Sequence, residues 1–376
     1  MSRSQPDILI IGAGIAGASA AAELARTHRV VLLEGETAPG YHSTGRSAAV
    51  FSESYGNWTV RALTRASRDF FHQPPPGFSP YPLLKHRSWL HVAAASQAAV
   101  LEEFLATEDI AARARRISPE EALTLSPLLR PETAAAGGAY EKDAADIDVD
   151  AFHQGYLRVL RQRGGSVLTR AHVTALTHGA GKWRVASTAG NFEAGVLINA
   201  AGAWADRVAA LAGVAPMGIQ PCRRTAALVE ISNREISDAW PVTIDIEEAY
   251  YFKPDAGLLL VSPADETPVE PCDVQPEELD VAIAIDRLER ATRVTVNRVR
   301  RTWAGLRSFA PDRTPVIGFD GAAPGFFWLA GQGGYGIQTA PAVAALAAAL
   351  VRDEPRPPEL ARFDPAAVSP ARFAGP

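Results

Sequence analysis

The chain begins with two short apolar runs on either side of an alanine-rich stretch. Residues 7–11 have the pattern of a buried β-strand, residues 18–27 that of a helix, and residues 29–34 that of a second strand. A glycine-rich turn, GAGIAG, joins the first strand to the helix. This order predicts a βαβ unit at the N-terminus.

Residues 37–55 form a long polar stretch rich in Gly, Ser and Thr. It is too long for an ordinary connection between elements, so we interpret it as a functional loop. The periodicity of residues 60–71 predicts a helix, and residues 72–82 are a proline-rich surface connection. Ser118 with the following Pro and Glu residues marks the start of another short helix.

The second half of the chain alternates between two kinds of pattern. Residues 151–164 predict a helix, and residues 166–202 predict a meander of short strands that returns to the first domain. Alternating strands and one helix, near residues 280–292, fill residues 219–296 and predict a second, sheet-based domain. Further along the chain, the predicted strands PVIGFD and GFFWLAG and the helix after GGYGIQ again have the pattern of the first domain. We therefore assign residues 1–85, 150–218 and 308–376 to the first domain and residues 86–149 and 219–307 to the second.

Length and composition agree with this division and narrow the function. A chain of 376 residues exceeds what one hydrophobic core usually organises. The net charge of −5 gives no basic surface for nucleic acid, so we expect a small-molecule partner. Cys222 and Cys272 are too few and too far apart for a disulfide framework or a metal cluster, so we expect two reduced thiols and no metal.

The sequence also gives an expectation for the cellular location of the protein. The N-terminus lacks the apolar core of a signal peptide, and no apolar run reaches roughly 18 residues. The apolar run that comes nearest to this length, at residues 342–351, is about half a membrane span long, and we interpret it as a buried helix. We expect no transmembrane segment and a cytoplasmic protein, with peripheral attachment to the inner membrane as the alternative.

The turn after the first strand carries the spacing of a dinucleotide site. Gly12 permits the tight turn, Gly14 lets the backbone approach a pyrophosphate, and Gly17 lets helix and strand pack closely. Glu34 ends the second strand, where a carboxylate binds ribose hydroxyls and disfavours a 2′-phosphate such as that of NADP. A glycine-rich helix start without a ligand is the plainer alternative.

Longer segments are similar to the FAD-dependent D-amino-acid oxidase and dehydrogenase superfamily. Within it, the strongest resemblance is to the bacterial D-arginine dehydrogenases. The matching strings are PGYHSTGRSAA, NAAGAW, KPDAG, TWAGLRSF and GGYGIQT, with a further match from ADID to HQGYLR. This resemblance implies an α/β fold: a Rossmann-like FAD-binding domain of the glutathione-reductase type, with an α+β substrate domain built on a mixed sheet.

The resemblance also implies how FAD is held. The binding should be noncovalent, because residues 302–312 lack the cysteine that sarcosine oxidases attach to flavin at this segment. The cofactor-binding residues implied are Gly12, Gly14, Ala16, Gly17, Glu34, Gly35, Ser43, Thr44, Arg46, Ser47, Ala48, Ala49, Val50, Val173, Gly202, Gly333, Gly334, Gly336, Ile337 and Gln338.

Amino-acid oxidation requires a carboxylate clamp, and arginine is the expected residue because its planar fork binds a carboxylate bidentately. By resemblance, Arg224 and Arg307 are this clamp, and Tyr251, Gly334 and Gln338 support it. Tyr55 resembles the tyrosine of a mobile loop that closes over the site. We interpret Tyr55, Tyr251, Arg224 and Arg307 as the catalytic residues, and no general base stands out.

Each of these residues also has a plainer interpretation. A tyrosine in a strand, such as Tyr251, is often a core or rim aromatic, and paired arginines such as Arg223 and Arg224 commonly solvate a strand edge. Arg307 is the stronger candidate, since it lies in an apolar segment where a cation requires a partner.

Two positions depart from the D-arginine enzymes. Trp89 stands where those enzymes have a glutamate that pairs with the cationic substrate side chain, and Val50 replaces a histidine beside the flavin. Both changes leave apolar surface, which predicts a preference for bulky apolar or aromatic side chains. The alternative is that Trp89 is a core residue pointing away from the substrate.

The sequence therefore predicts oxidative deamination of D-amino acids. Hydride would pass from the α-carbon to flavin N5, and the imino acid would hydrolyse to a 2-oxo acid and ammonia. Oxygen or a quinone would then reoxidise the flavin. The same clamp would suit an oxidase of 2-hydroxy acids or N-methyl amino acids, and a nucleotide-binding protein without turnover is the alternative of another class.

Overall fold

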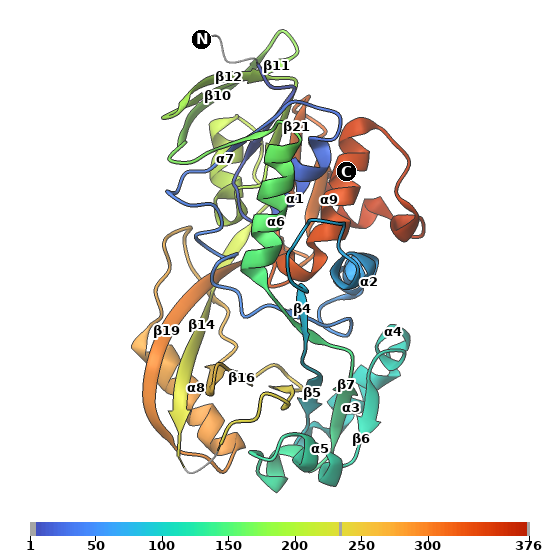
Figure 1. The fold of residues 1–376 in the computed structure, drawn as a ribbon, viewed down its shortest axis with the longest axis vertical. Helices are drawn as coiled ribbons and strands as arrows, with labels where there is room; N and C mark the ends of the chain where they lie inside the picture. The colour runs from blue at the N-terminus through green and yellow to red at the C-terminus, as the bar shows by residue number, and fades with distance from the viewer. Residues whose placement is uncertain (1–4, 233–234, 374–376) are drawn as a thin grey trace.

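The computed structural model describes residues 5–232 and 235–373. Two main β-sheets lie at opposite ends of the molecule, and the N-terminal, central and C-terminal parts of the chain share the upper half in Figure 1. The expectation that the chain has no signal peptide concerns in part residues 1–4, which lie outside the described residues.

The first sheet has six strands, all parallel to their neighbours except at one edge, where β20 and β21 are antiparallel. Both faces of such a sheet are covered, so its strands are apolar at nearly every position, with Ser166 and Asn199 as exceptions at strand ends. In spatial order the strands are β20 (Val316–Phe319), β21 (Phe326–Ala330), β13 (Val196–Asn199), β1 (Ile8–Ile11), β2 (Val30–Leu33) and β9 (Ser166–Leu168).

Alternate side chains of this sheet enter two different cores. Ile8 and Ile10 pack with the helices on one face, whereas Leu9 and Ile11 pack with a three-stranded meander on the other. The predicted βαβ unit and meander are both confirmed. The helices are α1 (Ile15–Leu24), α2 (Trp58–His72), α6 (Val149–Gln162) and α9 (Gly336–Arg352), and the meander is β10 (Val173–Gly179), β11 (Lys182–Ser187) and β12 (Gly190–Ala194).

The second sheet is mixed, as predicted. Its two halves come from separate stretches of the chain, which meet where β15 pairs in parallel with β5. In order the strands are β22 (Gln332–Gly333), β19 (Val296–Phe309), β14 (Gln220–Ile231), β17 (Leu258–Ser262), β16 (Tyr251–Asp255), β15 (Val242–Asp245), β5 (Trp89–Val92), β7 (Gly138–Glu141) and β6 (Arg115–Ile117), with β18 (Thr267–Pro268) beside β14. The helices α3 (Ala98–Ala106), α4 (Glu108–Ala111), α5 (Pro119–Leu125) and α8 (Glu278–Ala291) belong to this half.

Two connections hold the halves together. The short strand β22 precedes α9 of the first half and pairs with the end of β19. A small sheet also forms from β3 (Val50–Phe51), β8 (Ala145–Ile147) and β4 (Leu84–His86). The long polar stretch 37–55 is thus not entirely loop, because β3 pairs with β8 near its end.

Helix starts follow the expected capping chemistry. The Asn57 side chain accepts a hydrogen bond from the backbone N–H of Val60 at the start of α2, and Ser118 does the same for Glu121 at α5. Residues 342–351 lie in the buried helix α9. In the described part of the chain, we find no helix with the length and apolarity needed to cross a bilayer.

Candidate active site

A cavity of about 430 Å³ begins where β1, β2 and β13 end and runs towards β14, β16 and β19. The carboxyl ends of parallel strands are the usual ligand-binding edge of such a sheet. Loops that follow these three strands supply its inner wall, and the second sheet supplies its far end. The cavity therefore connects the two halves of the molecule.

The glycine turn has no room for side chains. A Cβ on Gly12, whose φ is +101°, would lie 2.4 Å from the carbonyl oxygen of Ala200. A Cβ on Gly17 would lie 1.9 Å from the carbonyl oxygen of Gly12. Gly14 caps α1 and lines the cavity. The turn thus presents bare backbone and a helix N-terminus to the cavity, which suits a phosphate group.

Glu34 lies at the inner end of the cavity beside this turn. One carboxylate oxygen accepts a hydrogen bond from Ala13 N at 2.9 Å, and the other accepts one from Glu36 N at 3.0 Å. Gly35 and Val173 line the same end. These bonds hold the carboxylate facing a space where a ribose can bind.

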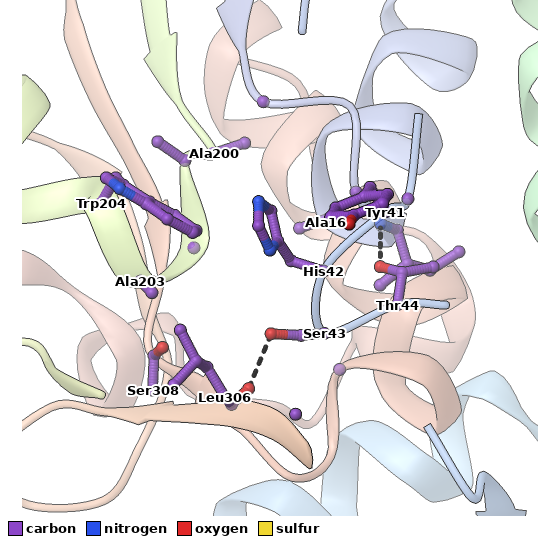
Figure 2. Close-up of a pocket in the computed structure, with 18 of the residues that line it drawn as sticks. Ala16, Tyr41, His42, Ser43, Thr44, Ala200, Ala203, Trp204, Leu306 and Ser308 are labelled. Atoms are coloured by element: carbon purple, nitrogen blue, oxygen red, sulfur yellow. Dashed lines mark hydrogen bonds between the residues drawn. The ribbon is translucent and has the colours of Figure 1, made fainter. Parts of the chain in front are cut away.

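The polar stretch after β2 forms one wall. The Ser43 hydroxyl donates to the carbonyl oxygen of Leu306 at 2.6 Å, which ties this wall to β19 (Figure 2). Thr44 accepts a hydrogen bond from the backbone N–H of Ile15 at 3.0 Å, at the first residue of α1. Of the residues in this stretch that were expected to bind FAD, Ala49 and Val50 lie outside the cavity, and the others line it: Ser43, Thr44, Arg46, Ser47 and Ala48.

Arg46 lines the cavity, but its guanidinium is bound elsewhere. It pairs with Asp273 and donates to the carbonyl oxygens of Val274, at 2.8 Å, and Ala304. The indole N–H of Trp303 in turn donates to the Arg46 carbonyl oxygen at 3.0 Å. This side chain fastens the wall to the second domain.

An aromatic pair that the sequence analysis did not single out lies in the cavity. The His42 ring packs on Trp204 with centroids 4.6 Å apart, and Figure 2 shows His42 between Trp204 and Thr44. His42 Nε2 contacts Glu36 at 3.0 Å, whereas its buried Nδ1 has no hydrogen-bond partner among the described residues. Gly202, with φ +55°, lines the cavity next to this pair.

The segment from Gln332 to Tyr335 and the start of α9 form the opposite wall. Their residues Gly333, Gly334, Gly336 and Ile337 line the cavity. A Cβ on Gly334 would lie 2.7 Å from Arg307 Cζ, so this glycine makes room for the guanidinium.

Arg307 is the cation at the far end of the cavity. Its Nη1 donates to the Tyr55 hydroxyl at 3.1 Å, and no ion pair to it is present within residues 5–232 and 235–373. Tyr251 lines the cavity beside it. Burial raises the pKa of Tyr55, so its phenol is protonated and neutral. The arginine therefore has donors to spare for an anion.

Arg224 also lines the cavity, but it is more fully engaged. Its Nε donates to the Asp265 carbonyl oxygen at 2.7 Å, and its Nη2 contacts Glu266 at 3.0 Å. Glu266 pairs with Arg313 as well. Arg223 and Arg224 are both buried, so the interpretation of paired arginines on a solvated edge is wrong.

Trp89 is buried behind Tyr55 and does not line the cavity described above. The two rings lie 5.2 Å apart, and Trp89 shares an apolar cluster with Val50 and Tyr251. Its indole N–H donates to Nε2 of His91 at 3.3 Å. Trp89 is thus part of the core and also supports the tyrosines at the end of the cavity.

Gln338 is not brought to the cavity. Its side-chain oxygen accepts a hydrogen bond from Ser52 N at 3.2 Å, and its nitrogen donates to the Thr64 hydroxyl at 3.0 Å. Both ends of the amide are therefore bound to protein groups, in contrast to the expected contact with flavin and substrate.

His91 makes stability depend on pH. Burial lowers its pKa to about 3, whereas an unfolded chain has a value near 6.5. The neutral ring is also required to accept the Trp89 hydrogen bond. The neutral His91 ring makes its full contribution to the free energy of unfolding above pH 6.5. As the pH falls from 6.5 towards 3, this contribution decreases by about 1.4 kcal/mol per pH unit. Urea unfolding should show that the free energy of unfolding falls by about 2 kcal/mol between pH 7 and pH 5. In the His91→Gln variant this decrease should be absent. An unchanged slope in the variant would refute this assignment.

Comparison with known proteins places the chain in a family. The model of the FAD dependent oxidoreductase family, DAO, matches residues 7–350, and the chain belongs to this family. The hydrogen cyanide synthase subunit HcnC of Pseudomonas aeruginosa is 28% identical over 249 residues, which cover 63% of this chain and 58% of that protein. The chain thus spans less than two thirds of that relative.

Two solved structures share the fold over nearly the whole length. Glycine oxidase from Geobacillus kaustophilus has a TM-score of 0.83 and 22% identity, covering 98% of this chain and 99% of its own. L-proline dehydrogenase from P. horikoshii has a TM-score of 0.83 and 20% identity, covering 98% of each chain. The protein is accordingly an FAD-dependent oxidoreductase, and its cofactor is FAD.

Proposed function

We propose that this oxidoreductase deaminates D-amino acids and prefers bulky apolar or aromatic side chains. The observation that carries the proposal is Arg307, a cation that faces the cavity with a tyrosine and no carboxylate as its partner among the described residues. A cation in such surroundings requires an anion, and a substrate carboxylate is the natural one. Glycine and proline, named for the two structural relatives, both carry a carboxylate on the amine-bearing carbon.

The cavity suits FAD along its length, and we assign its residues accordingly. Glu34 would hold the ribose next to adenine, and the backbone of Gly14 and Ala16 at the start of α1 would hold the pyrophosphate. Two buried polar atoms of the cavity wall, the Ser308 hydroxyl and Gln332 Nε2, have no hydrogen-bond partner among the described residues. Such atoms are costly unless a ligand satisfies them. We propose that FAD is bound noncovalently, since neither cysteine is among the lining residues.

Arg307 would fix the substrate by its carboxylate, and Tyr251 would flank it. The Tyr55 phenol, kept neutral by burial, would orient the guanidinium. Arg224 would add a second positive charge through the part of its guanidinium that Asp265 and Glu266 do not use. When bound, FAD supplies the acceptor for the hydride of the α-carbon, at its N5 atom. The product imino acid would hydrolyse to a 2-oxo acid and ammonia.

The preference for apolar side chains is supported by the cluster beside Tyr55. Trp89, Val50, Val242 and Ile244 pack together there with Tyr55 and Tyr251. Of this cluster, Tyr251 lines the cavity, and a cationic substrate side chain beside its ring would gain only cation–π attraction, about 0.5 to 2 kcal/mol. It would find no charge-assisted hydrogen bond from the residues of this cluster.

This preference predicts the order of substrates. The holoenzyme should oxidise D-phenylalanine or D-leucine with kcat/KM at least about tenfold above that for D-arginine, since one charged hydrogen bond is worth about 1.5–3 kcal/mol. Initial rates with an artificial electron acceptor measure this. Highest kcat/KM for D-arginine or D-lysine would overturn the preference while leaving the reaction class in place. Faster turnover of 2-hydroxy acids or N-methyl amino acids would identify these as the substrates instead. Whether air reoxidises the reduced flavin would distinguish oxygen from a quinone as the electron acceptor.

A further inference from the structure

A buried carboxylate outside the cavity holds the segment that leads to Tyr55. Glu141, the last residue of β7, is only 4% exposed. It accepts hydrogen bonds from the Ser52 hydroxyl at 2.7 Å, from Glu53 N at 2.8 Å, and from the N–H and hydroxyl of Ser54 at 3.3 and 2.5 Å. All four donors belong to three consecutive residues immediately before Tyr55.

This carboxylate has no cationic partner in the described ranges of the chain. Burial raises the pKa of Glu141, and the hydrogen bonds of the serines and of Glu53 N oppose that rise. A buried carboxylate without a cation is costly, and a neutral amide would be cheaper to bury. However, an amide would turn an NH₂ group towards some of these donors. The carboxylate is therefore the group that can accept from every donor of this segment at once.

The same segment is held from two other directions. Gln338 accepts the hydrogen bond of Ser52 N, which fixes the start of the segment. Trp89 lies directly opposite Glu141 in the β5–β7 register, and its ring packs on Tyr55. Glu141 on β7 thus binds the segment before Tyr55, and Trp89 on the neighbouring strand β5 packs against the Tyr55 ring.

We infer that Glu141 is a positioning residue: it sets the Tyr55 hydroxyl against Arg307 and so prepares the guanidinium for the substrate carboxylate. The inference rests on the proposed function, in which Arg307 binds that carboxylate. Tyr55 is the residue that carries the effect, because it follows these three residues directly and its hydroxyl oxygen accepts a hydrogen bond from Arg307 Nη1. Glu141 itself does not touch the substrate in this account.

The test is a double-mutant cycle read by binding of benzoate, a simple carboxylate, to the purified holoenzyme. The dissociation constant is taken from the change in flavin absorbance. Glu141→Gln should raise it about tenfold, as expected for a lost charge-assisted hydrogen bond, and Tyr55→Phe should raise it by a similar factor. The double variant should be no weaker than Tyr55→Phe alone, since both changes act through one contact. Glu193→Gln is the control: Glu193 lies on β12, is not among the residues that line the cavity, and should leave benzoate binding as in the wild type.

The outcomes separate the inference from the proposed function. If Arg307→Met leaves benzoate binding unchanged, the carboxylate clamp is wrong and the inference falls with it. If Arg307→Met weakens binding but Glu141→Gln does not, or if the effects of Glu141→Gln and Tyr55→Phe simply multiply, only the inference is overturned. Should Glu141→Gln fail to fold, Ser54→Ala removes one of the four donors and is read in the same cycle, with a smaller, equally non-additive rise expected.

Discussion

Replacement of Arg307 by methionine is expected to lower kcat/KM for the best D-amino acid by about 10³-fold, equivalent to ~4 kcal/mol of transition-state stabilisation. The reason is electrostatic. Methionine fills similar space but removes the guanidinium that binds the substrate carboxylate, and leaves only Arg224, which Asp265 and Glu266 already engage in part. Flavin content should be unaffected, because the lost group faces the substrate end of the cavity.

Arg298→Met provides the matched control for this substitution. Arg298 lies on the same strand, β19, but is exposed to solvent, so its loss should leave kcat/KM within about twofold. Lysine at position 307 should restore only part of the activity, since it supplies the charge without the bidentate geometry. Full activity of Arg307→Met with normal flavin content would exclude Arg307 as the carboxylate anchor.

The substitution Gly17→Ala is expected to abolish FAD binding. Its Cβ would lie 1.9 Å from the Gly12 carbonyl oxygen, a backbone atom that cannot move unless the turn opens. Opening the turn displaces the start of α1 from β1 and with it the backbone groups that suit the pyrophosphate. The purified variant should be colourless, and the ratio of flavin to protein absorbance measures the loss.

Gly179→Ala is the control for that experiment. Gly179 ends β10, and a Cβ there would meet nothing within 4 Å. This variant should retain full flavin content. If Gly17→Ala purified yellow with stoichiometric FAD, the glycine turn could not have the packing role assigned to it.

Local patterns predicted the first half of the fold well because that half is built from short-range units. A strand, a helix and a strand joined by tight turns are readable wherever every strand position is apolar, as at Ile8–Ile11. The strand β19 was harder to recognise, since its first half is exposed and rich in arginine. The parallel pairing of β15 with β5 joins residues about 150 positions apart, which no local pattern reveals.

The same distinction between short-range and long-range features applies to the residues of the candidate site. Gly12, Gly17 and Glu34 act through a compact motif, so their placement could be predicted. The bond of Glu141 to the Ser52–Ser54 segment joins residues 87 to 89 positions apart, and it was not foreseen. The pairing of Arg224 with Glu266 was missed because a sequence does not reveal which carboxylate a buried arginine finds.

The central claim is that FAD in this protein accepts electrons from D-amino acids. The most direct measurement is the absorbance of the bound flavin under anaerobic conditions during addition of D-phenylalanine or L-phenylalanine. We expect rapid bleaching by the D-enantiomer and none by the L-enantiomer, followed by formation of phenylpyruvate and ammonia. Bleaching by the L-enantiomer alone, or by a 2-hydroxy acid but by no D-amino acid, would contradict it.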